Sequence, residues 1–520
     1  MNDPQHQFQS LMQAMQEPSF YPHAVETPIT CLQTHCSAVF LTGKYAYKLK
    51  KPVDFGFLDY STPAKRQHFL QEELRLNLPI APDIYRQVLP LYYQHNQWHW
   101  GAKTGHAEDY VLQMQQFPQH CLLSSLFEQK KLTDDHIIRL GKRVAEFHQQ
   151  TPTNEEIMSF GDPDVIWRSV ANNFKATEKY IGIVQSQQQF NQIKQFCETF
   201  YQQHLDWFKE RQTQGKIREC HGDLHLNNLC DWQGKIQLFD RIEFNQPFRF
   251  VDVMYDVAFT VMDLDAKNRS DWAYLFLNTY LEQTGDWQGL KILPFYLCRQ
   301  AYVRAKVTSF LLDDQNLTDQ DKQIALNSAQ HYYTLAWQYS QRKPGRIILM
   351  SGLSGSGKST LAQPLSLQLP AVWIRSDAVR KQLGGIALHQ TGDQELYTPA
   401  MTGRVYQTLF TLGKRVRDAG FNVILDAKFD RIQWRSPFVK FAEDQGVNLR
   451  IIHCQAPMNV LKQRLHHRQG DISDATVDLL AEQQATWQDF TESEQSFVIE
   501  VNTQQDWQAF LSKYSKFKVV

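Results

Sequence analysis

The sequence lacks the features that mark secreted, membrane-spanning and nucleic-acid-binding proteins. Its first residues, MNDPQHQFQSLMQ, contain neither a basic segment nor an apolar core, so we expect no signal peptide. No apolar run approaches the roughly eighteen residues that a membrane-spanning helix needs. The net charge is −1, so no long-range field favours nucleic acid or an anionic membrane.

Cysteine is also scarce. The 8 cysteines are scattered over 520 residues, with no C-x-x-C pair and no zinc-binding spacing. We therefore expect reduced thiols and a cytoplasmic location. Glutamine is abundant but spread along the chain, so no low-complexity tail is expected. A 42% hydrophobic fraction is typical of globular proteins, and the length predicts about two to four domains.

The clearest motif lies at residues 345–360, GRIILMSGLSGSGKST. The apolar residues 347–350 predict a buried strand, and 352–359 fit the P-loop pattern G-x-x-x-x-G-K-[ST]. Glycines let backbone N–H groups face phosphate oxygens, and the helix that follows adds its positive dipole end. Lys358 would contact the β and γ phosphates and Ser359 would bind Mg²⁺; the alternative is a Gly/Ser turn with a solvated lysine. The predicted nucleotide-binding residues here are Gly352, Ser354, Gly355, Ser356, Gly357, Lys358, Ser359 and Thr360.

Two segments after the P-loop could supply the acceptor side and the metal. Ser376 is a candidate helix cap, and Asp377 and Arg380 would share the first face of that helix. An acid there can deprotonate an acceptor hydroxyl and an arginine can hold an anionic acceptor; the alternative is a capping and salt-bridging pair. The strand 422–426 has the Walker B form, so Asp426 would hold Mg²⁺.

A basic helix is predicted at 458–469. It carries Arg464 and Arg468 together with other cations. These charges suit either a solvated helix face or a lid that closes on a transferring phosphate.

The first part of the chain predicts a small β-rich region. Strands at 37–42 and 45–50 are joined by Gly43 and Lys44 in a hairpin, and Lys48 and Lys50 share one strand face. A helix at 64–77 and strands at 84–91 and 98–117 follow. Lys48 could pair with Glu72 or Glu73, as in the small lobe of a kinase, or it could simply be solvated.

A second constellation lies between Glu219 and Asp256. His221 begins the spacing H-x-D-x-x-x-x-N, which contains Asp223 and Asn228, and a strand at 236–239 ends at Asp240. Kinases use this layout for phosphoryl transfer: one Asp accepts the hydroxyl proton, and an Asn and a second Asp hold Mg²⁺. The alternative is a polar turn, and His221 is expected to brace the loop.

The residues of the predicted phosphoryl-transfer loop resemble those of a known kinase family. His221, Asp223, Asn228, Asp240 and the strand lysine Lys48 resemble the aminoglycoside phosphotransferase and choline kinase branch of the protein-kinase-like fold. Residues 48–59 and 242–245 resemble a bacterial subfamily in which such a domain is fused to a P-loop kinase-like domain. The resemblance implies that Lys48 holds the α and β phosphates and pairs with Glu73 (or Glu72). It further implies that Asp223 is the base, that Asn228 and Asp240 bind metal, and that Asp256 is structural.

This sequence departs from the family pattern at two points. It has no G-x-G-x-x-G loop over the phosphates, and Arg241 follows Asp240 where the pattern has Gly. Neither departure removes a metal ligand, but both leave room for a degenerate first domain.

The second half resembles the group of zeta toxins, polynucleotide 5′-kinases and gluconate- or adenylylsulfate-kinase-like enzymes. The P-loop, residues 376–380 and 422–429, and the stretch 455–475 carry this resemblance. It implies that Asp377 activates the acceptor, that Arg380 binds it, and that Arg464 and Arg468 form the lid. Lys428 stands where relatives tend to have a small polar residue.

The expected fold is a two-lobed α+β kinase-like domain at residues 1–341, followed by an α/β P-loop domain with a parallel sheet at 347–520. The small lobe would span about 25–117 and the helical lobe about 118–341, with a linker at 342–346.

Each half would transfer the γ-phosphate of Mg-ATP to a hydroxyl of a small polar metabolite. ATP and Mg²⁺ are the expected cofactors, and membranes are not expected partners. One alternative is that one half only senses nucleotide. Another is a zeta-toxin-like or nucleic-acid end kinase, which the neutral charge disfavours.

Overall fold

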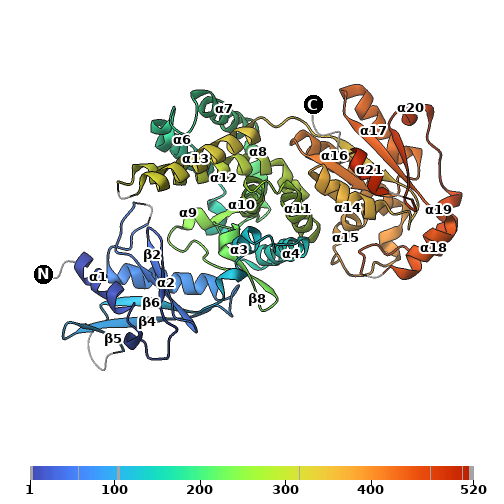
Figure 1. The fold of residues 1–520 in the computed structure, drawn as a ribbon. Helices are drawn as coiled ribbons and strands as arrows, with labels where there is room; N and C mark the ends of the chain where they lie inside the picture. Colours follow the sequence, from blue (N-terminus) through green and yellow to red (C-terminus); the bar gives the residue numbers. More distant parts are fainter. Residues whose placement is uncertain are drawn as a thin grey trace. The chain divides into compact units, whose positions relative to one another are not determined.

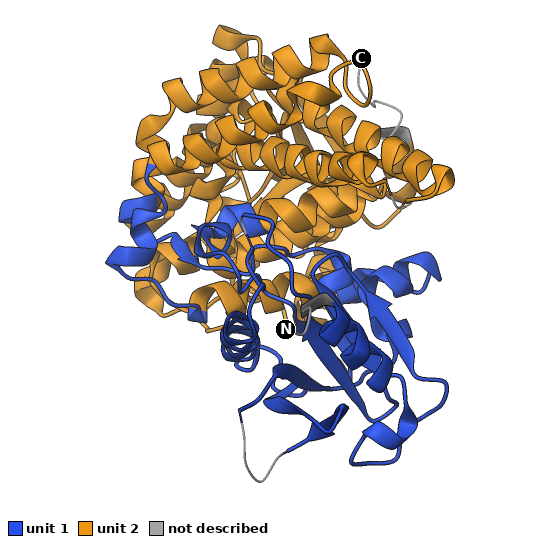
Figure 2. Cartoon of the chain, turned by 90° about the vertical axis from the view of Figure 1, so that its left-hand side faces the viewer, with its two compact units in different colours: residues 1–136, 150–162, 212–256 blue, residues 137–149, 163–211, 257–520 orange. Residues whose placement is uncertain are grey.

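The computed structural model describes most of the chain as two compact units. The described residues are 4–56, 58–101, 106–315, 317–468, 470–505 and 507–514. One unit comprises residues 1–136, 150–162 and 212–256, and the other comprises 137–149, 163–211 and 257–520 (Figure 2). Phe57, in the resemblance segment 48–59, and Gln469, at the end of the predicted basic helix, lie outside the described residues. The predicted boundary at 342–346 stays a prediction.

A six-stranded antiparallel sheet forms the first part of the chain, in the order β1-β2-β3-β6-β4-β5 (Figure 1). Its strands are β1 (Thr30–Gln33), β2 (Ser37–Leu41), β3 (Tyr45–Lys50), β4 (Tyr85–Gln94), β5 (Gln97–Trp100) and β6 (Asp109–Gln115). The predicted hairpin is confirmed: β2 and β3 pair with Val39 opposite Lys48. Gly43, in the turn, has φ +91°, which glycine adopts without strain.

Helix α2 (Pro63–Asn77) packs against β4 and β6. Its start has the expected chemistry: the Thr62 side chain accepts from the N–H of Lys65, and Pro63 occupies the first helical position. Leu70 is fully buried and packs with Ile84 and other apolar residues. The helix therefore presents Glu73, which is also buried, on its inner side.

Two short pairs of strands lie in and around the segment 219–256. Strand β7 (Ile217–Glu219) pairs with β10 (Phe250–Asp252), and β8 (Leu229–Trp232) forms a hairpin with β9 (Lys235–Leu238), with Leu229 opposite Leu238. Because the hairpin is closed at its other end, the residues just before β8 and just after β9 are neighbours. This register brings Asn228 beside Phe239 and Asp240.

Helices dominate from residue 122 to 340, as the sequence predicted. The longer ones are α4 (Asp134–Gln150), α6 (Pro163–Thr177), α7 (Gln187–Gln203), α8 (Leu205–Thr213), α10 (Val253–Ala266), α11 (Ser270–Thr284), α12 (Leu293–Phe310) and α13 (Asp319–Ser340). None of the helices in the described part of the chain combines the length and apolar character that crossing a bilayer requires.

The last part of the chain is built on a five-stranded parallel sheet with the order β12-β13-β11-β14-β15. Its strands are β11 (Ile347–Ser351), β12 (Ala371–Arg375), β13 (Asn422–Asp426), β14 (Leu449–Gln455) and β15 (Val498–Asn502). Every residue of β11 is buried, as expected of a parallel strand covered on both faces. The predicted P-loop architecture is confirmed.

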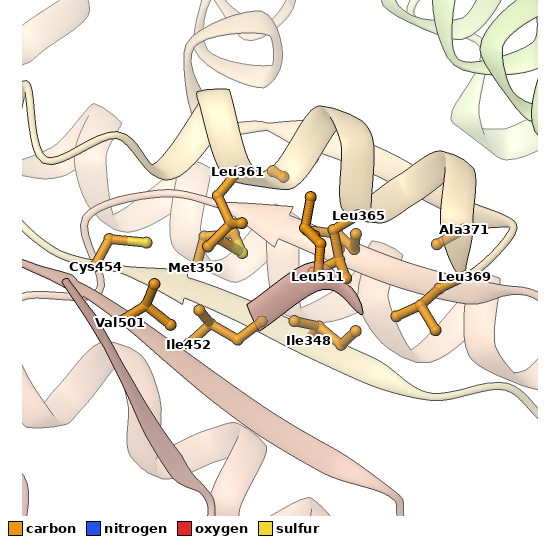
Figure 3. Packing of buried hydrophobic residues seen from close by; sticks show 12 residues of the cluster. Ile348, Met350, Leu361, Leu365, Leu369, Ala371, Ile452, Cys454, Val501 and Leu511 are labelled. Carbon is orange, nitrogen blue, oxygen red and sulfur yellow. The ribbon is translucent and has the colours of Figure 1, made fainter. Parts of the chain in front are cut away.

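Helix α14 (Lys358–Gln368) covers one face of this sheet. Figure 3 shows Leu361 and Leu365 of the helix packed over strand residues such as Ile348 and Ile452. Pro364 lies inside the helix, one full turn beyond the residues that begin it. The other helices of this part are α15 (Ser376–Leu383), α16 (Pro399–Asp418), α17 (Ile432–Gln445), α18 (Met458–His467), α19 (Leu479–Ala485), α20 (Glu492–Gln495) and α21 (Trp507–Tyr514).

Candidate functional site

The first candidate site is built around Lys48 on β3. Its Nζ lies 2.7 Å from Oε1 of Glu73 and 2.6 Å from Oδ1 of Asp240. Glu72 instead pairs with Arg75 at 3.0 Å, so Glu73 is the partner of the strand lysine. Burial alone would lower the pKa of Lys48, but the carboxylates of Asp240 and Glu73 raise it well above its ordinary value. Lys48 is therefore held as a cation.

A second buried lysine supports the first. Nζ of Lys50 lies 2.9 Å from Oε2 of Glu73 and 2.5 Å from Oε1 of Glu243, and the Tyr60 hydroxyl also donates to Glu243. Lys50 is 1% exposed and Glu73 is 0% exposed. Both glutamate oxygens of Glu73 are thus bound to lysines two residues apart on one strand. Sequence reasoning placed Lys48 and Lys50 on one face and noted 242–245 as a resemblance, but it gave Glu243 no role and did not point to Tyr60.

The loop that follows β7 is held by Asp256. The backbone N–H groups of His221 and Gly222 donate to its two carboxylate oxygens, at 2.7 and 2.8 Å. Nε2 of His221 donates to the carbonyl of Phe239 at 2.9 Å, and burial lowers the pKa of the ring. Gly222 has φ +85°, and a Cβ there would lie 2.6 Å from the carbonyl oxygen of Phe248. His221 thus braces the loop as a neutral ring.

Asp223 and Asn228 lie together on this loop. Nδ2 of Asn228 donates to the backbone carbonyl of Asp223 at 3.0 Å and to its Oδ2 at 3.1 Å. Nε2 of His225 is 3.3 Å from the same Oδ2. The N–H of Phe239 donates to the carbonyl of Asn228 at 3.1 Å, which joins the loop to the segment carrying Asp240.

Arg241, the departure from the family pattern, is a structural residue. Its guanidinium donates to the carbonyls of Leu76 at 2.7 Å and Cys220 at 3.2 Å, and it also binds that of Glu219. Burial lowers the pKa of Arg241 to about 10. The side chain therefore ties the end of α2 to the end of β7. The preceding residue, Asp240, has a left-handed φ of +62°.

The second candidate site is the P-loop between β11 and α14. Gly352, Gly355 and Gly357 have φ values of +138°, +78° and +87°. A Cβ on Gly352 would lie 2.4 Å from the carbonyl oxygen of Cys454. Glycine is therefore required here, and the loop leads directly into the helix N-terminus at Lys358.

The two predicted metal ligands of the P-loop site, Ser359 and Asp426, meet at the end of β13. Oγ of Ser359 donates to Oδ2 of Asp426 at 2.7 Å, and Nε1 of Trp373 donates to the same oxygen at 3.2 Å. Nζ of Lys358 donates to the carbonyl of Leu353 at 2.8 Å. Burial lowers the pKa of Lys358, against the opposing charge of Asp426.

The remaining predicted nucleotide-binding residues of the P-loop differ in their surroundings. The N–H of Ser354 donates to Oε1 of Gln483 at 3.0 Å, Ser356 is buried, and Thr360 is in the first turn of α14. Gln483 belongs to α19, more than a hundred residues away, and no sequence pattern pointed to it. Its amide oxygen occupies a backbone donor of the phosphate loop.

The acceptor-side residues lie on α15, which begins directly after β12. Burial raises the pKa of Asp377, with the charges of Arg375 and Arg380 opposing it. Nη1 of Arg380 donates to the carbonyl of Leu396 at 2.6 Å. The prediction that Ser376 caps this helix is wrong: the cap position is Arg375, and no side chain makes a capping bond.

The two predicted lid arginines bind backbone carbonyls. Nη1 of Arg464 donates to Oγ1 of Thr503 at 2.9 Å and to the carbonyl of Gly355 at 3.3 Å. Nη2 of Arg468 donates to carbonyls within 473–475. Arg464 thus contacts the P-loop through the carbonyl of Gly355. A contact of either arginine with a phosphate stays a prediction.

The comparisons with known proteins give one family match and one relative along most of the chain. Residues 347–490 match the family described as AAA domain. An uncharacterized protein of Mycobacterium tuberculosis is 29% identical over 474 residues, which cover 90% of this chain and 92% of that protein. The P-loop and strands β11 to β14 of the parallel sheet thus lie within the residues that match this family.

Two solved structures are similar to separate parts of the chain. A choline/ethanolamine kinase family protein from Mesorhizobium loti is 9% identical, covers 64% of this chain and 99% of its own, and has a TM-score of 0.37. A gluconokinase from Sinorhizobium meliloti is 23% identical, covers 34% of this chain and 96% of its own, and has a TM-score of 0.24.

Proposed function

We propose that this chain is an ATP-dependent phosphotransferase with two sites. Each site would transfer the γ-phosphate of Mg-ATP to a hydroxyl of a small polar acceptor. The observation that carries the proposal is that in each part a segment bearing a partly buried lysine meets, from far along the chain, an aspartate of the type that binds Mg²⁺. Lys48 meets Asp240, and the P-loop that carries Lys358 meets Asp426 through Ser359.

In the first site, the roles follow from position and charge. Lys48, oriented by Glu73, would bind the α and β phosphates. Asp223, whose side chain is 36% exposed, would accept the proton of the acceptor hydroxyl. Because Asp256 and His221 fix the loop backbone, Asp223 needs little reorganisation to meet its substrate.

In the second site, the P-loop would hold the phosphates of a second ATP. Its N–H groups and the start of α14 supply the positive potential, and Lys358 adds a charge next to the β and γ phosphates. Asp377, whose pKa is raised by burial, would accept the acceptor proton as a general base. Arg380 would orient the acceptor.

The residues fit Mg²⁺ in both sites, because their donor atoms are the carboxylate, amide and hydroxyl oxygens that this hard cation prefers. Asn228 and Asp240 would hold it in the first site, and Ser359 and Asp426 in the second. The ion would neutralise phosphate charge there. The closeness of Ser359 Oγ and Asp426 Oδ2, 2.7 Å, supports one shared position.

Turnover of Mg-ATP by the full chain tests the proposal. Asp223→Asn should remove the activity of the first site and Lys358→Ala that of the second, each by about 10²-fold or more against a broad panel of small hydroxyl compounds. The double variant should be inactive. If one single variant alone abolishes all turnover, the chain has one catalytic site, and the other part is a nucleotide-sensing module.

A further inference from the structure

The side chain of Asn278, on helix α11, completes the free edge of the P-loop sheet. Strand β12 is an edge strand. Nδ2 of Asn278 donates to the carbonyl of Ala371 at 3.0 Å, and its Oδ1 accepts from the N–H of Trp373 at 2.9 Å. These are the two bonds that a residue of a neighbouring parallel strand would make. Asn278 is 7% exposed, so the bonds are shielded from water.

One turn further along α11, Glu282 reaches the catalytic end of the same strand. Four helical residues advance about 6 Å, and two strand residues advance roughly 6.6 Å, so Glu282 lies level with Arg375. Oε1 of Glu282 is 3.6 Å from Nη1 of Arg375. The Arg375 side chain is 12% exposed and its other terminal nitrogen binds Asp471.

Strand β12 connects the residues that contact α11 with residues of the P-loop site. The indole of Trp373, whose backbone Asn278 holds, donates to Asp426. Arg375 is followed two residues later by Asp377, the proposed base, and its charge acts on that carboxyl group. Helix α11 also packs against α14, which begins with the P-loop lysine.

We propose that the P-loop site is composite: helix α11, which lies outside the segment matching the AAA domain family, belongs to it, and Glu282 is a positioning residue that holds Arg375 beside Asp377. The inference rests on the proposed function of the P-loop site. It deepens that function by making the acceptor side depend on the helical region of the chain.

The charges around this contact determine the expected effect. Glu282 faces Arg375, Asp471, Asp426 and Lys142. Asp377 interacts with Arg375, Arg380, Asp426, Asp471, Lys358, Tyr397 and Tyr406. Removing the charge of Glu282 leaves the cation of Arg375 less neutralised, so Arg375 stabilises the ionised form of Asp377 more strongly.

The test uses the full chain with Asp223→Asn, so that Mg-ATP turnover comes from the P-loop site. In that background Glu282→Gln should move the acid limb of the pH–rate profile to lower pH by about half a unit, with KM for ATP changed less than about twofold. Asn278→Asp, which sets a carboxylate against the Ala371 carbonyl, should lower turnover. Gln283→Ala, on the same helix, is the matched control and should change neither.

A second measurement does not depend on turnover. Amide hydrogen exchange of 371–380 should be faster in the Asn278→Asp and Glu282→Gln variants than in Gln283→Ala. If Lys358→Ala leaves turnover unchanged in the Asp223→Asn background, the proposed function of this site is wrong. Amide hydrogen exchange of 371–380 still tests whether α11 holds strand β12 in that case. If exchange and the acid limb both match the control, Glu282 and α11 have no positioning role.

Discussion

At the scale of single residues, the buried charges of the first site form one connected group. Glu73 accepts from two lysines, of which Lys50 is 1% exposed and so has no water to compensate for the loss of the carboxylate. Glu72, its neighbour, pairs with the half-exposed Arg75 at 3.0 Å and lies 3.9 Å from Nη2 of Arg249. The two adjacent glutamates are therefore expected to contribute differently to the free energy of unfolding, although the sequence pattern does not distinguish them.

Glu73→Gln should destabilise the chain far more than Glu72→Gln. Removing one partner of a buried ion pair leaves an uncompensated charge and costs about 3 kcal/mol, whereas loss of an exposed pair costs about 1 kcal/mol or less. Thermal unfolding followed by circular dichroism measures the difference. Equal midpoints for the two variants would contradict the buried network.

His453, on β14, gives a prediction for acid stability. Its ring lies 5.0 Å from that of Trp487 and 5.1 Å from that of Phe490, and burial, with the charges of Arg435 and Lys358, lowers its pKa to about 4. The folded state therefore binds the proton more weakly than the unfolded state. The stability is fully present above pH 6.5 and is lost as the pH falls from about 6.5 to 4.

The loss should amount to about 2 kcal/mol once solvent screening is allowed for. His453→Gln should remove this part of the pH dependence, because glutamine does not titrate. Denaturant unfolding at pH 7 and pH 4.5 measures the effect, with His389→Gln, at an exposed position, as the control. An unchanged pH dependence in His453→Gln would exclude His453 as the titrating group.

At the scale of elements, Arg241 connects helix α2 with strand β7. It satisfies three backbone carbonyls that a glycine at the same place would leave to other partners. The departure from the family pattern thus adds a buried tie between the helix that carries Glu73 and the loop that carries Asp223. It is compatible with a working first site.

Arg241→Ala should lower the free energy of unfolding by about 2–4 kcal/mol, since it leaves buried carbonyls without a donor. Arg75→Ala, which removes a half-exposed arginine nearby, should cost less than about 1 kcal/mol. Denaturant titration compares the two. A cost for Arg241→Ala no larger than that of Arg75→Ala would show that water replaces the guanidinium.

At the scale of the whole molecule, net charge argues against a nucleic-acid substrate. With a formal charge of −1, the chain has no excess of cations to release counterions from a phosphate backbone. Arg464 and Arg468, the predicted lid arginines, donate to the backbone carbonyls of Thr503 and Ala475.

A labelled single-stranded oligonucleotide should therefore show no binding to the full chain at micromolar protein and about 50 mM salt, measured by fluorescence anisotropy. A basic single-strand-binding protein serves as the positive control. Binding that weakens steeply as salt is raised would instead favour the nucleic-acid end kinase, the alternative that the sequence leaves open.

Features that depend on consecutive residues could be predicted from the amino-acid sequence. The P-loop follows from a continuous pattern, because its glycines, Lys358 and Ser359 are consecutive and their backbone geometry is set by residue type. The same holds for the hairpin of β2 and β3 and for helix α2, which lie close to their predicted bounds. The spacing from Asp223 to Asn228 is likewise a local pattern.

Which distant side chains share a site became known from the folded chain alone. It selected Glu73 over Glu72, joined Glu243 to Lys50, and set Gln483 against the P-loop. It also brought Asn278 and Glu282 of a helix to the edge of a sheet that begins about seventy residues later. Such pairings depend on how elements pack, and hydrophobic periodicity specifies which face is buried without specifying its neighbour.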